Sequence, residues 1–302
     1  MVQSVLSRYL SPETLSRMAD RHIEPRGLVI GNLAGHHKSP LAGFAVEFAG
    51  HREYVPGDDP KHIDWRVYFT RDKYFIKQYE METNFVCHLI LDVSASMRYG
   101  EERRQKLLYA AQMATTLGYS IIRQSDKVSL ATFDERVLGV VPPSNSMGQI
   151  VRMTEHLDTI EPVRKTRMAE CLGELAGRMG RREIVMVFSD FFTDLDKLES
   201  ALQRMRYQKH EVVLFQVMHH DELEFEFDGM IKFVGLELPQ ELLTQPQELR
   251  AGYLKALKRF NDRFDEMCQH NRVERILVDT SRDMGEVFVD YLNQRSLLNR
   301  GR

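Results

Sequence analysis

The chain has 302 residues, of which 43% are hydrophobic and 28% charged, a balance typical of a globular protein. Its 41 basic and 44 acidic residues leave a formal charge of −3, which gives no general attraction for nucleic acid or anionic lipid. No apolar run reaches the ~20 residues of a membrane span, and the first residues lack the apolar core of a signal peptide. Three widely spaced cysteines without a C-x-x-C pair exclude a thiolate zinc site and favour a reducing compartment. We therefore expect a cytoplasmic protein without a membrane span or a nucleic-acid partner.

The first 82 residues predict a small β-rich module. Ser11 followed by Pro12 is typical of a helix start, and the glycines and proline between residues 31 and 40 indicate a loop. Strand-like segments follow at residues 44–54, 65–69 and 74–79. We therefore divide the chain into an N-terminal β-rich module, residues 1–82, and a main domain, residues 83–302.

In the main domain, strand-like and helix-like segments alternate, which is the pattern of a doubly wound sheet. The expected strands are residues 85–91, 127–133, 136–141, 183–189, 211–218, 231–236 and 275–279. The expected helices are residues 103–123, 146–157, 168–179, 195–207, 247–269 and 284–297. Because crossovers between parallel strands are right-handed, this order predicts a Rossmann-like α/β fold, a doubly wound, mostly parallel sheet with helices on both faces.

A group of oxygen-bearing side chains follows the first of these strands. Residues 85–91 are nearly all apolar, as in a strand buried on both faces, and Asp92, Ser94 and Ser96 come next at alternate positions. Alternate residues of an extended chain point the same way, so one carboxylate and two hydroxyls are expected to converge at the carboxyl edge of the sheet. Such hard oxygen donors suit Mg²⁺, Mn²⁺ or Ca²⁺. The alternative is that the three residues only turn the chain and cap the next helix.

Two further oxygen donors occur where a metal site at Asp92 would need them. Asp190 directly follows the apolar strand 183–189, and it faces Asp92 if the two strands are neighbours in the sheet. Thr166 precedes the helix that begins at Met168. Each has a simpler interpretation, a loop acid for Asp190 and a helix N-cap for Thr166. In this order, however, the five residues together predict a metal site.

This pattern resembles the metal-ion-dependent adhesion site of von Willebrand factor A domains. The resemblance implies a divalent ion held by a carboxylate, three hydroxyls and a second carboxylate that binds directly or through water. In that order, these groups belong to Asp92, Ser94, Ser96, Thr166 and Asp190. The upstream stretch HREYVPGDDPKHIDW, residues 51–65, resembles the signature of the domain of unknown function 58 family, in which it precedes such an A-type domain.

Members of that family are associated with AAA+ ATPases of the MoxR type, which remodel or activate protein complexes. The resemblance therefore implies a non-enzymatic adaptor or co-chaperone that presents its metal face to an acidic residue of a MoxR-type ATPase or of its client protein. The alternative is a metal-dependent phosphate-ester hydrolase with Asp92 as nucleophile or ligand. Phosphatases of the haloacid dehalogenase type need a second acid two positions further on, where this chain has Ser94. No nucleophile elbow or phosphate-binding glycine loop is present in the sequence.

Two other polar stretches have alternative interpretations. A second metal site is conceivable near the signature, although the histidine spacing fits no zinc ligand pattern. The histidines concerned are His36, His37, His51 and His62. We expect instead that Asp58 and Asp59 cap a turn, and that Arg52, Asp64 and Trp65 form an ion-pair and packing cluster.

Residues 221–227 alternate acids with aromatic residues and a leucine. This stretch predicts either a solvated edge strand or a docking surface for a basic partner.

Overall fold

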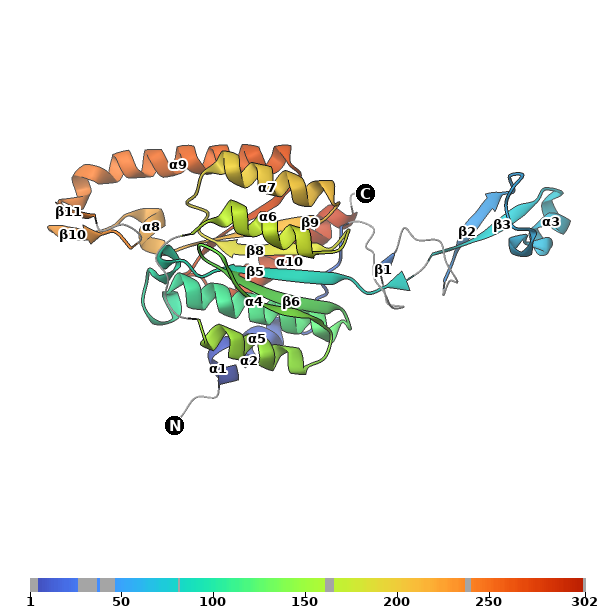
Figure 1. Ribbon diagram of the computed structural model, residues 1–302, viewed down its shortest axis with the longest axis horizontal. Helices are drawn as coiled ribbons and strands as arrows, with labels where there is room; N and C mark the ends of the chain where they lie inside the picture. Colours follow the sequence, from blue (N-terminus) through green and yellow to red (C-terminus); the bar gives the residue numbers. More distant parts are fainter. Residues whose placement is uncertain are drawn as a thin grey trace. The chain divides into compact units, whose positions relative to one another are not determined.

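The computed structural model describes residues 5–26, 37–38, 47–80, 82–160, 166–236 and 240–300. The chain forms two compact units (Figure 1). The main unit contains residues 1–26 and 86–302, and the inserted unit contains residues 27–85. The N-terminal module predicted for residues 1–82 thus differs from the inserted unit, because the first 26 residues belong to the main unit.

The main unit is built on a six-stranded sheet in the order β12-β9-β8-β5-β6-β7. Its strands are β5 (Val86–Asp92), β6 (Lys127–Phe133), β7 (Val137–Ser144), β8 (Ile184–Ser189), β9 (Glu211–Met218) and β12 (Glu274–Asp279). All neighbours are parallel except β6 and β7, which form an antiparallel pair at one edge. β5 and β8 are buried along almost their whole length, which explains why their sequences are continuous apolar runs. The predicted Rossmann-like, mostly parallel sheet is confirmed.

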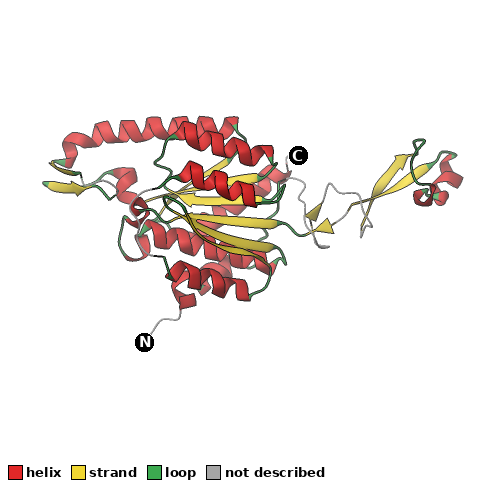
Figure 2. Cartoon of the chain, in the orientation of Figure 1, coloured by secondary structure: helices red, strands yellow, loops and turns green. Residues whose placement is uncertain are grey.

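Helices cover both faces of this sheet (Figure 2). They are α4 (Lys106–Arg123), α5 (Gly148–Asp158), α6 (Met168–Arg178), α7 (Leu195–Tyr207), α9 (Pro246–His270) and α10 (Met284–Arg300). α6, α7 and α9 lie over one face of the sheet, and α4 and α5 lie over the other (Figure 1). Each of the six helices overlaps a helix expected from the sequence.

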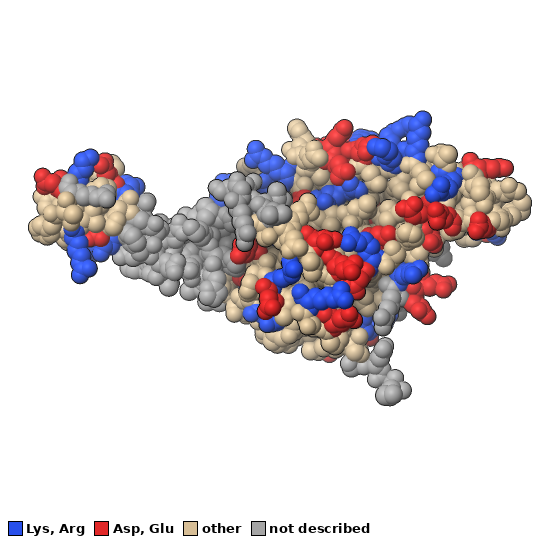
Figure 3. Space-filling model, turned by 180° about the vertical axis from the view of Figure 1, so that it is seen from behind, with Lys and Arg blue, Asp and Glu red and all other residues tan. Residues whose placement is uncertain are grey.

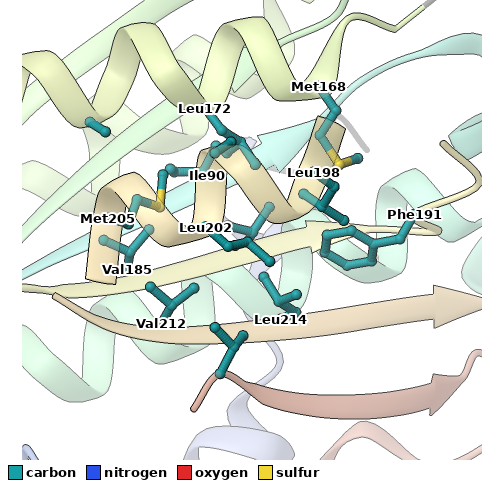
Figure 4. Close-up of a cluster of buried hydrophobic side chains, with 14 of the residues drawn as sticks. Ile90, Met168, Leu172, Val185, Phe191, Leu198, Leu202, Met205, Val212 and Leu214 are labelled. Carbon is teal, nitrogen blue, oxygen red and sulfur yellow. The ribbon is translucent and has the colours of Figure 1, made fainter. Parts of the chain in front are cut away.

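A large part of the core lies between the sheet and the helices α6 and α7 (Figure 4). Ile90 of β5, Val185 of β8 and Leu214 of β9 form one buried cluster with Leu172 of α6 and Leu202 of α7. Burying an apolar side chain of this size contributes about 1.5–3 kcal/mol relative to leaving it exposed. The cluster therefore fixes the positions of β5 and β8, whose carboxyl ends carry the predicted site.

Two short helices near the beginning of the chain, α1 (Val5–Tyr9) and α2 (Pro12–Arg17), belong to the main unit. α1 contacts α4 and α5, and α2 contacts α10. Met18 and Ile23 of the same segment are almost completely buried. This burial explains why the first 26 residues belong to the main unit, because moving apolar side chains from water into a packed interior lowers the free energy.

The inserted unit contains a twisted pair of antiparallel strands, β2 (Glu47–Glu53) and β3 (Phe75–Glu80), with a bulge between Phe48 and Gly50. A second, two-residue pair joins β1 (His37–Lys38) to β4 (Glu82–Thr83). The strand predicted at residues 65–69 is wrong, because this segment is the helix α3 (Trp65–Arg71). Its β-branched and aromatic composition favours a strand, but Asp64 caps the helix by accepting a hydrogen bond from the Arg66 amide. Most of the predicted loop at residues 31–40 lies outside the described residues.

A small peripheral sheet extends from the main unit between β9 and α9. It pairs β10 (Ile231–Val234), which lies within the strand predicted at residues 231–236, with β11 (Glu241–Thr244), which was not predicted. Residues 221–227 do not form the edge strand that was one of their two interpretations, because α8 (His220–Glu224) begins there with a capping box between His219 and Glu222. In the described part of the chain, no helix combines the length and the apolar composition needed to cross a lipid bilayer.

Candidate functional site

Two buried aspartates lie at the carboxyl ends of neighbouring strands. β5 and β8 pair in parallel, with Leu91 opposite Phe188, so that Asp92 and Asp190 are brought to the same edge of the sheet. Asp92 is fully buried, and Asp190 is 3% exposed. The neighbour relation that the sequence analysis required is therefore present.

The Asp92 carboxylate is held by two hydrogen bonds, one from its own turn and one from the neighbouring strand β8. The Ser94 amide donates to Asp92 Oδ1 over 2.9 Å, and the Ser189 hydroxyl donates to Asp92 Oδ2 over 2.7 Å. The hydroxyls of Ser94 and Ser96 lie 3.2 Å apart. These side chains converge as predicted. The predicted reason, a fully extended backbone, is incomplete, because the backbone is extended only as far as Ser94. It then enters a short 3-10 helix, η2 (Ala95–Arg98). The turn of this helix brings Ser96 back towards Ser94.

Burial changes the acidity of Asp92. Burial and the nearby charge of Asp190 together raise the pKa of this carboxyl group to about 7, against the hydrogen bonds from Ser189 and Ser94. A cation beside Asp92 would favour its ionised form, because an opposite charge lowers the pKa of a carboxyl group.

Asp190 is neutralised by a lysine that the sequence analysis missed. Lys106 Nζ donates to Asp190 Oδ2 over 2.9 Å and to Glu222 Oε1 over 2.8 Å, and the lysine is fully buried. Burial alone would lower the pKa of the Lys106 ammonium, but the charges of Asp190 and Glu222 outweigh it and raise the pKa above its usual value. One signal for this role exists in the sequence. Lys106 begins α4, where the helix dipole disfavours a positive charge unless acids compensate it.

Thr166 is brought to the same edge by backbone hydrogen bonds. Asp92 pairs with Phe133 of β6, and the next residue, Asp134, accepts a hydrogen bond from the Arg167 amide over 2.9 Å. The hydroxyl of Thr166 and the Oδ2 atom of Asp134 are buried and have no hydrogen-bond partner within the described ranges. Such atoms are costly, because they have lost water without replacing it. The alternative interpretation of Thr166 as a helix N-cap is not observed, since the α6 cap position is Arg167 and carries no side-chain cap bond.

The donor set at this edge fits a hard divalent cation. Asp92, Ser94, Ser96 and Thr166 offer only oxygen atoms, and the Thr166 hydroxyl has an unused donor and acceptor. Asp92, Asp190 and Glu222 with the Lys106 ammonium carry a formal charge of −2 when all are ionised, which balances such an ion. No group of three or more His, Cys, Asp or Glu side chains in the described ranges forms a metal cluster, so a cation here would depend on the hydroxyls.

The histidines of the signature stretch do not form the second metal site that was considered. His51 Nε2 lies 2.8 Å from Asp64 Oδ2, and that pair belongs to no larger metal cluster in the parts that the structure describes. His36 and the side chain of His37 lie outside those parts.

The acids of the signature cap turns, as predicted. Asp58 accepts from the Val55 amide, and Asp59 accepts from the Lys61 amide at the start of a 3-10 helix, η1 (Pro60–His62). The predicted cluster of Arg52, Asp64 and Trp65 is corrected in part, because the Arg52 guanidinium pairs with Asp58 over 2.8 Å.

The strand order, the antiparallel edge strand β7 and the Asp-x-Ser-x-Ser turn after β5 define an α/β domain of the von Willebrand factor A type. Residues 50–263 match the family model described as protein of unknown function DUF58. Because the match covers more than half of the chain, this protein belongs to that family.

The chain is similar to three uncharacterized proteins, one from Mycobacterium bovis and two from strains of Mycobacterium tuberculosis. Each is 21% identical over 197 residues, which are 64% of this chain and 62% of the relative. The chain thus matches less than two thirds of the length of these relatives.

Among solved structures, the chain is similar to the BatB protein of Bacteroides thetaiotaomicron, at 13% identity and a TM-score of 0.47, over 72% of this chain and all of that one. An aerotolerance-related membrane protein from Bacteroides fragilis matches at 16% identity and a TM-score of 0.46, over 70% of this chain and all of that one. The VWA domain of SpRpn10 matches at 13% identity and a TM-score of 0.39, over 69% of this chain and 95% of that one.

Proposed function

We propose that this protein is a non-enzymatic interaction module that binds a protein partner through a divalent cation, Mg²⁺ or its relatives Mn²⁺ and Ca²⁺. The residues that would hold the ion are Asp92, Ser94, Ser96, Thr166 and Asp190. The observation that carries the proposal is a buried carboxylate surrounded by hydroxyls, one of which, that of Thr166, is buried without a partner. A cation bound mainly by neutral hydroxyls keeps a strong positive field and an open coordination position for a partner's carboxylate.

The residues around the carboxyl edge of the sheet have different proposed roles. Ser189 and the Ser94 amide orient the Asp92 carboxylate, so that it is held in one position before any ion arrives. The Lys106 ammonium neutralises part of the Asp190 charge. Asp190 is therefore better suited to bind the ion through a water molecule than to bind it directly. Asp190 is also held by the Phe192 amide, and the residue between them, Phe191, has a left-handed backbone with a φ of 58°. A bulky residue in this conformation is uncommon, and such strain is found at functional sites.

The surface beside the site favours a protein as the partner. Glu222, which pairs with Lys106, lies in α8, and the β10–β11 sheet follows α8 in the chain. That sheet exposes large apolar side chains, including Leu242 at 52% and Leu243 at 65%. Phe225 stacks on Tyr253 of α9 with ring centroids 4.4 Å apart, which attaches the segment to the long helix. Acidic and basic side chains are interspersed on the face of the main unit in Figure 3, which supports a protein rather than nucleic acid.

The partner that we propose is a MoxR-type AAA+ ATPase or its client, with this protein as adaptor or co-chaperone. The support is the family to which the chain belongs and its resemblance to proteins that work with such ATPases. A single carboxylate–metal contact would orient the partner, and the exposed apolar side chains beside it would add interface area and specificity.

A pull-down with a purified MoxR-type AAA+ ATPase tests the proposal. We expect capture in Mg²⁺, and loss of at least about tenfold in EDTA or with Asp92→Ala. Asp262→Ala, which removes an exposed acid paired with Lys258 on α9, is the matched control and should bind normally. Equal capture under all conditions would remove the metal from the interaction.

The hydrolase alternative predicts a different result. The position two residues after Asp92 is Ser94, which cannot act as a general acid at neutral pH. We therefore expect no turnover of p-nitrophenyl phosphate with Mg²⁺. Turnover that Asp92→Ala abolishes would favour the hydrolase.

A further inference from the structure

Residues of α1, α4, α5 and η2 line a recess. The helices α1, α4 and α5 contact one another in the main unit (Figure 1). The recess has a volume of about 320 Å³. Three apolar side chains, Leu107, Leu108 and Leu157, form part of its wall, and Arg98 and Gln105 are polar residues of the lining. Arg98 is the last residue of η2 and follows Ser96 by two positions.

The charges in the recess leave one cation without a partner. Asp158 also lines the recess, but the Arg8 guanidinium lies 3.0 Å from its carboxylate, and the Tyr9 hydroxyl donates to the same oxygen over 3.1 Å. Arg98, in contrast, has no hydrogen bond or ion pair with any residue in the described ranges, and its Nε atom is buried. The recess therefore carries the positive charge of Arg98.

This arrangement is costly unless a ligand completes it. A guanidinium is always charged at neutral pH, and its five N–H groups form a planar fork that matches a carboxylate. The buried Nε donor of Arg98 has lost water without gaining a hydrogen-bond partner in the described ranges. Comparable guanidinium groups of this chain, such as those of Arg8 and Arg17, have carboxylate partners.

We propose that this recess binds a small carboxylate with an apolar group, with the carboxylate on Arg98 and the apolar group against Leu107, Leu108 and Leu157. The volume lies at the lower end of the range for ligand pockets, about 300–1,000 Å³, so the ligand is no larger than one or two amino-acid residues. A phosphate group fits less well, because it carries more charge than one guanidinium balances and Asp158 lies close by. Two sources supply this chemistry, a free short-chain acid and the C-terminal residue of a peptide. The proposal uses none of the five proposed metal ligands.

Isothermal titration calorimetry in EDTA tests the proposal independently of any metal. The probes are N-acetyl-leucine, its uncharged amide, acetate and 4-methylpentanoate. We expect N-acetyl-leucine to bind at least about tenfold tighter than the amide, which lacks the charge, and acetate, which lacks the apolar group. Equal binding of acid and amide would overturn the proposal.

Variants locate the binding. Arg98→Gln should weaken N-acetyl-leucine at least about tenfold, and Arg123→Gln, which removes the same charge from an exposed position at the end of α4, should not. Leu108→Trp fills the recess without changing its charge and should also abolish binding, so it decides the question if Arg98→Gln does not fold. Unchanged binding in both recess variants would contradict the proposal.

The source of the ligand follows from two further comparisons. If 4-methylpentanoate binds as tightly as N-acetyl-leucine, the recess serves free acids. If the tripeptide Ala-Ala-Leu with a free carboxylate binds tighter than both, it serves the end of a peptide chain. Either result supports the carboxylate assignment, whereas no binding of any acid would overturn it.

Discussion

Two buried polar networks, one around His88 at the amino end of the central sheet and one around Asp92 at its carboxyl end, differ in how completely they are paired. At the amino end, His88 of β5 joins Ser129 of β6 to Glu183, which precedes β8. Its Nδ1 atom lies 2.6 Å from the serine oxygen, and its Nε2 atom lies 2.8 Å from the carboxylate. The Glu183 amide donates to the ring of His210, which is fully buried. None of these side chains has a buried atom without a partner.

At the carboxyl end, the pairing is incomplete. Asp92, Lys106 and Asp190 are tightly held, but the Thr166 hydroxyl and one oxygen of Asp134 are buried and unpaired. A purely structural network can close on itself, as the His88 network shows. The unpaired oxygens of Thr166 and Asp134 instead leave ligand positions unused. The four predictions below either strengthen this contrast or remove it.

The largest effect is expected from Lys106→Met in EDTA. The substitution leaves the buried Asp190 without its ammonium partner, and breaking a buried pair costs about 3–5 kcal/mol. Urea unfolding measures this loss. Lys258→Met breaks an exposed pair on α9 and should cost less than about 0.5 kcal/mol. A loss as small as that of the control would show that Lys106 does not stabilise the buried acids at the carboxyl end of the sheet.

Next is Asp92→Asn, whose effect depends on pH. Burial raises the pKa of Asp92 from 3.8 to about 7, so between these values the folded protein keeps a proton that the unfolded chain has released. The free energy of unfolding contributed by Asp92 is therefore fully present below pH ~4 and falls as the pH rises towards 7.

The asparagine variant lacks this titration. In EDTA at pH 8 it should be more stable than the wild type, on the order of 2–4 kcal/mol, with little difference at pH 4. Thermal or urea unfolding across this pH range provides the measurement. In saturating Mg²⁺ only the wild type should gain stability, and a variant that responds equally would argue against the proposed ion.

His88→Leu tests the amino end. It leaves Ser129 and Glu183 without their shared partner, which should cost about 1–3 kcal/mol in urea unfolding. Because this network is purely structural in our interpretation, Mg²⁺ affinity measured by calorimetry should stay within about twofold. A large change in Mg²⁺ affinity would mean that the two ends of the sheet are coupled.

The smallest change in stability, and the sharpest contrast, is expected from Thr166→Val. The substitution removes an unpaired hydroxyl, so the free energy of unfolding in EDTA should change by less than about 0.5 kcal/mol or rise slightly. Mg²⁺ affinity should nevertheless fall. Thr132→Val is the control, because the Thr132 hydroxyl lies 2.9 Å from His156 Nε2 and its loss should cost about 1 kcal/mol without affecting Mg²⁺. A loss of stability in EDTA without a change in Mg²⁺ affinity would mean that Thr166 has a structural role.

Local patterns explain what could be predicted from the sequence. The apolar runs of β5 and β8 and the turn after Asp92 depend on neighbouring residues, so both the sheet and the convergence of Asp92, Ser94 and Ser96 could be predicted. Lys106 could not be placed, because its contact with Asp190 spans 84 residues and depends on how α4 packs. The same holds for the unpaired hydroxyl of Thr166, since pairing is a property of the packed chain.

Amino-acid composition led to a wrong prediction for residues 65–69, where helix capping determines the structure. Residues 65–69 have the aromatic and β-branched side chains of a strand, yet Asp64 and the left-handed Asp72 define the two ends of a helix. The assignment of the first 26 residues failed for a different reason. Their apolar side chains are buried against helices that lie far away in sequence, and no local pattern carries that information.

The packing of the N-terminal segment against the end of the chain affects how the protein is made. The Arg295 guanidinium donates to the Glu24 carbonyl, and Arg17 pairs with Asp283. Glu24 and Arg295 are 271 positions apart. At ribosomal rates of roughly 5–20 residues per second, the nascent N-terminal segment waits about 15–50 s for this partner to be synthesised. During that time Met18 and Ile23 lack part of the surface that covers them in the folded protein, so their apolar side chains stay exposed to water until α10 is synthesised.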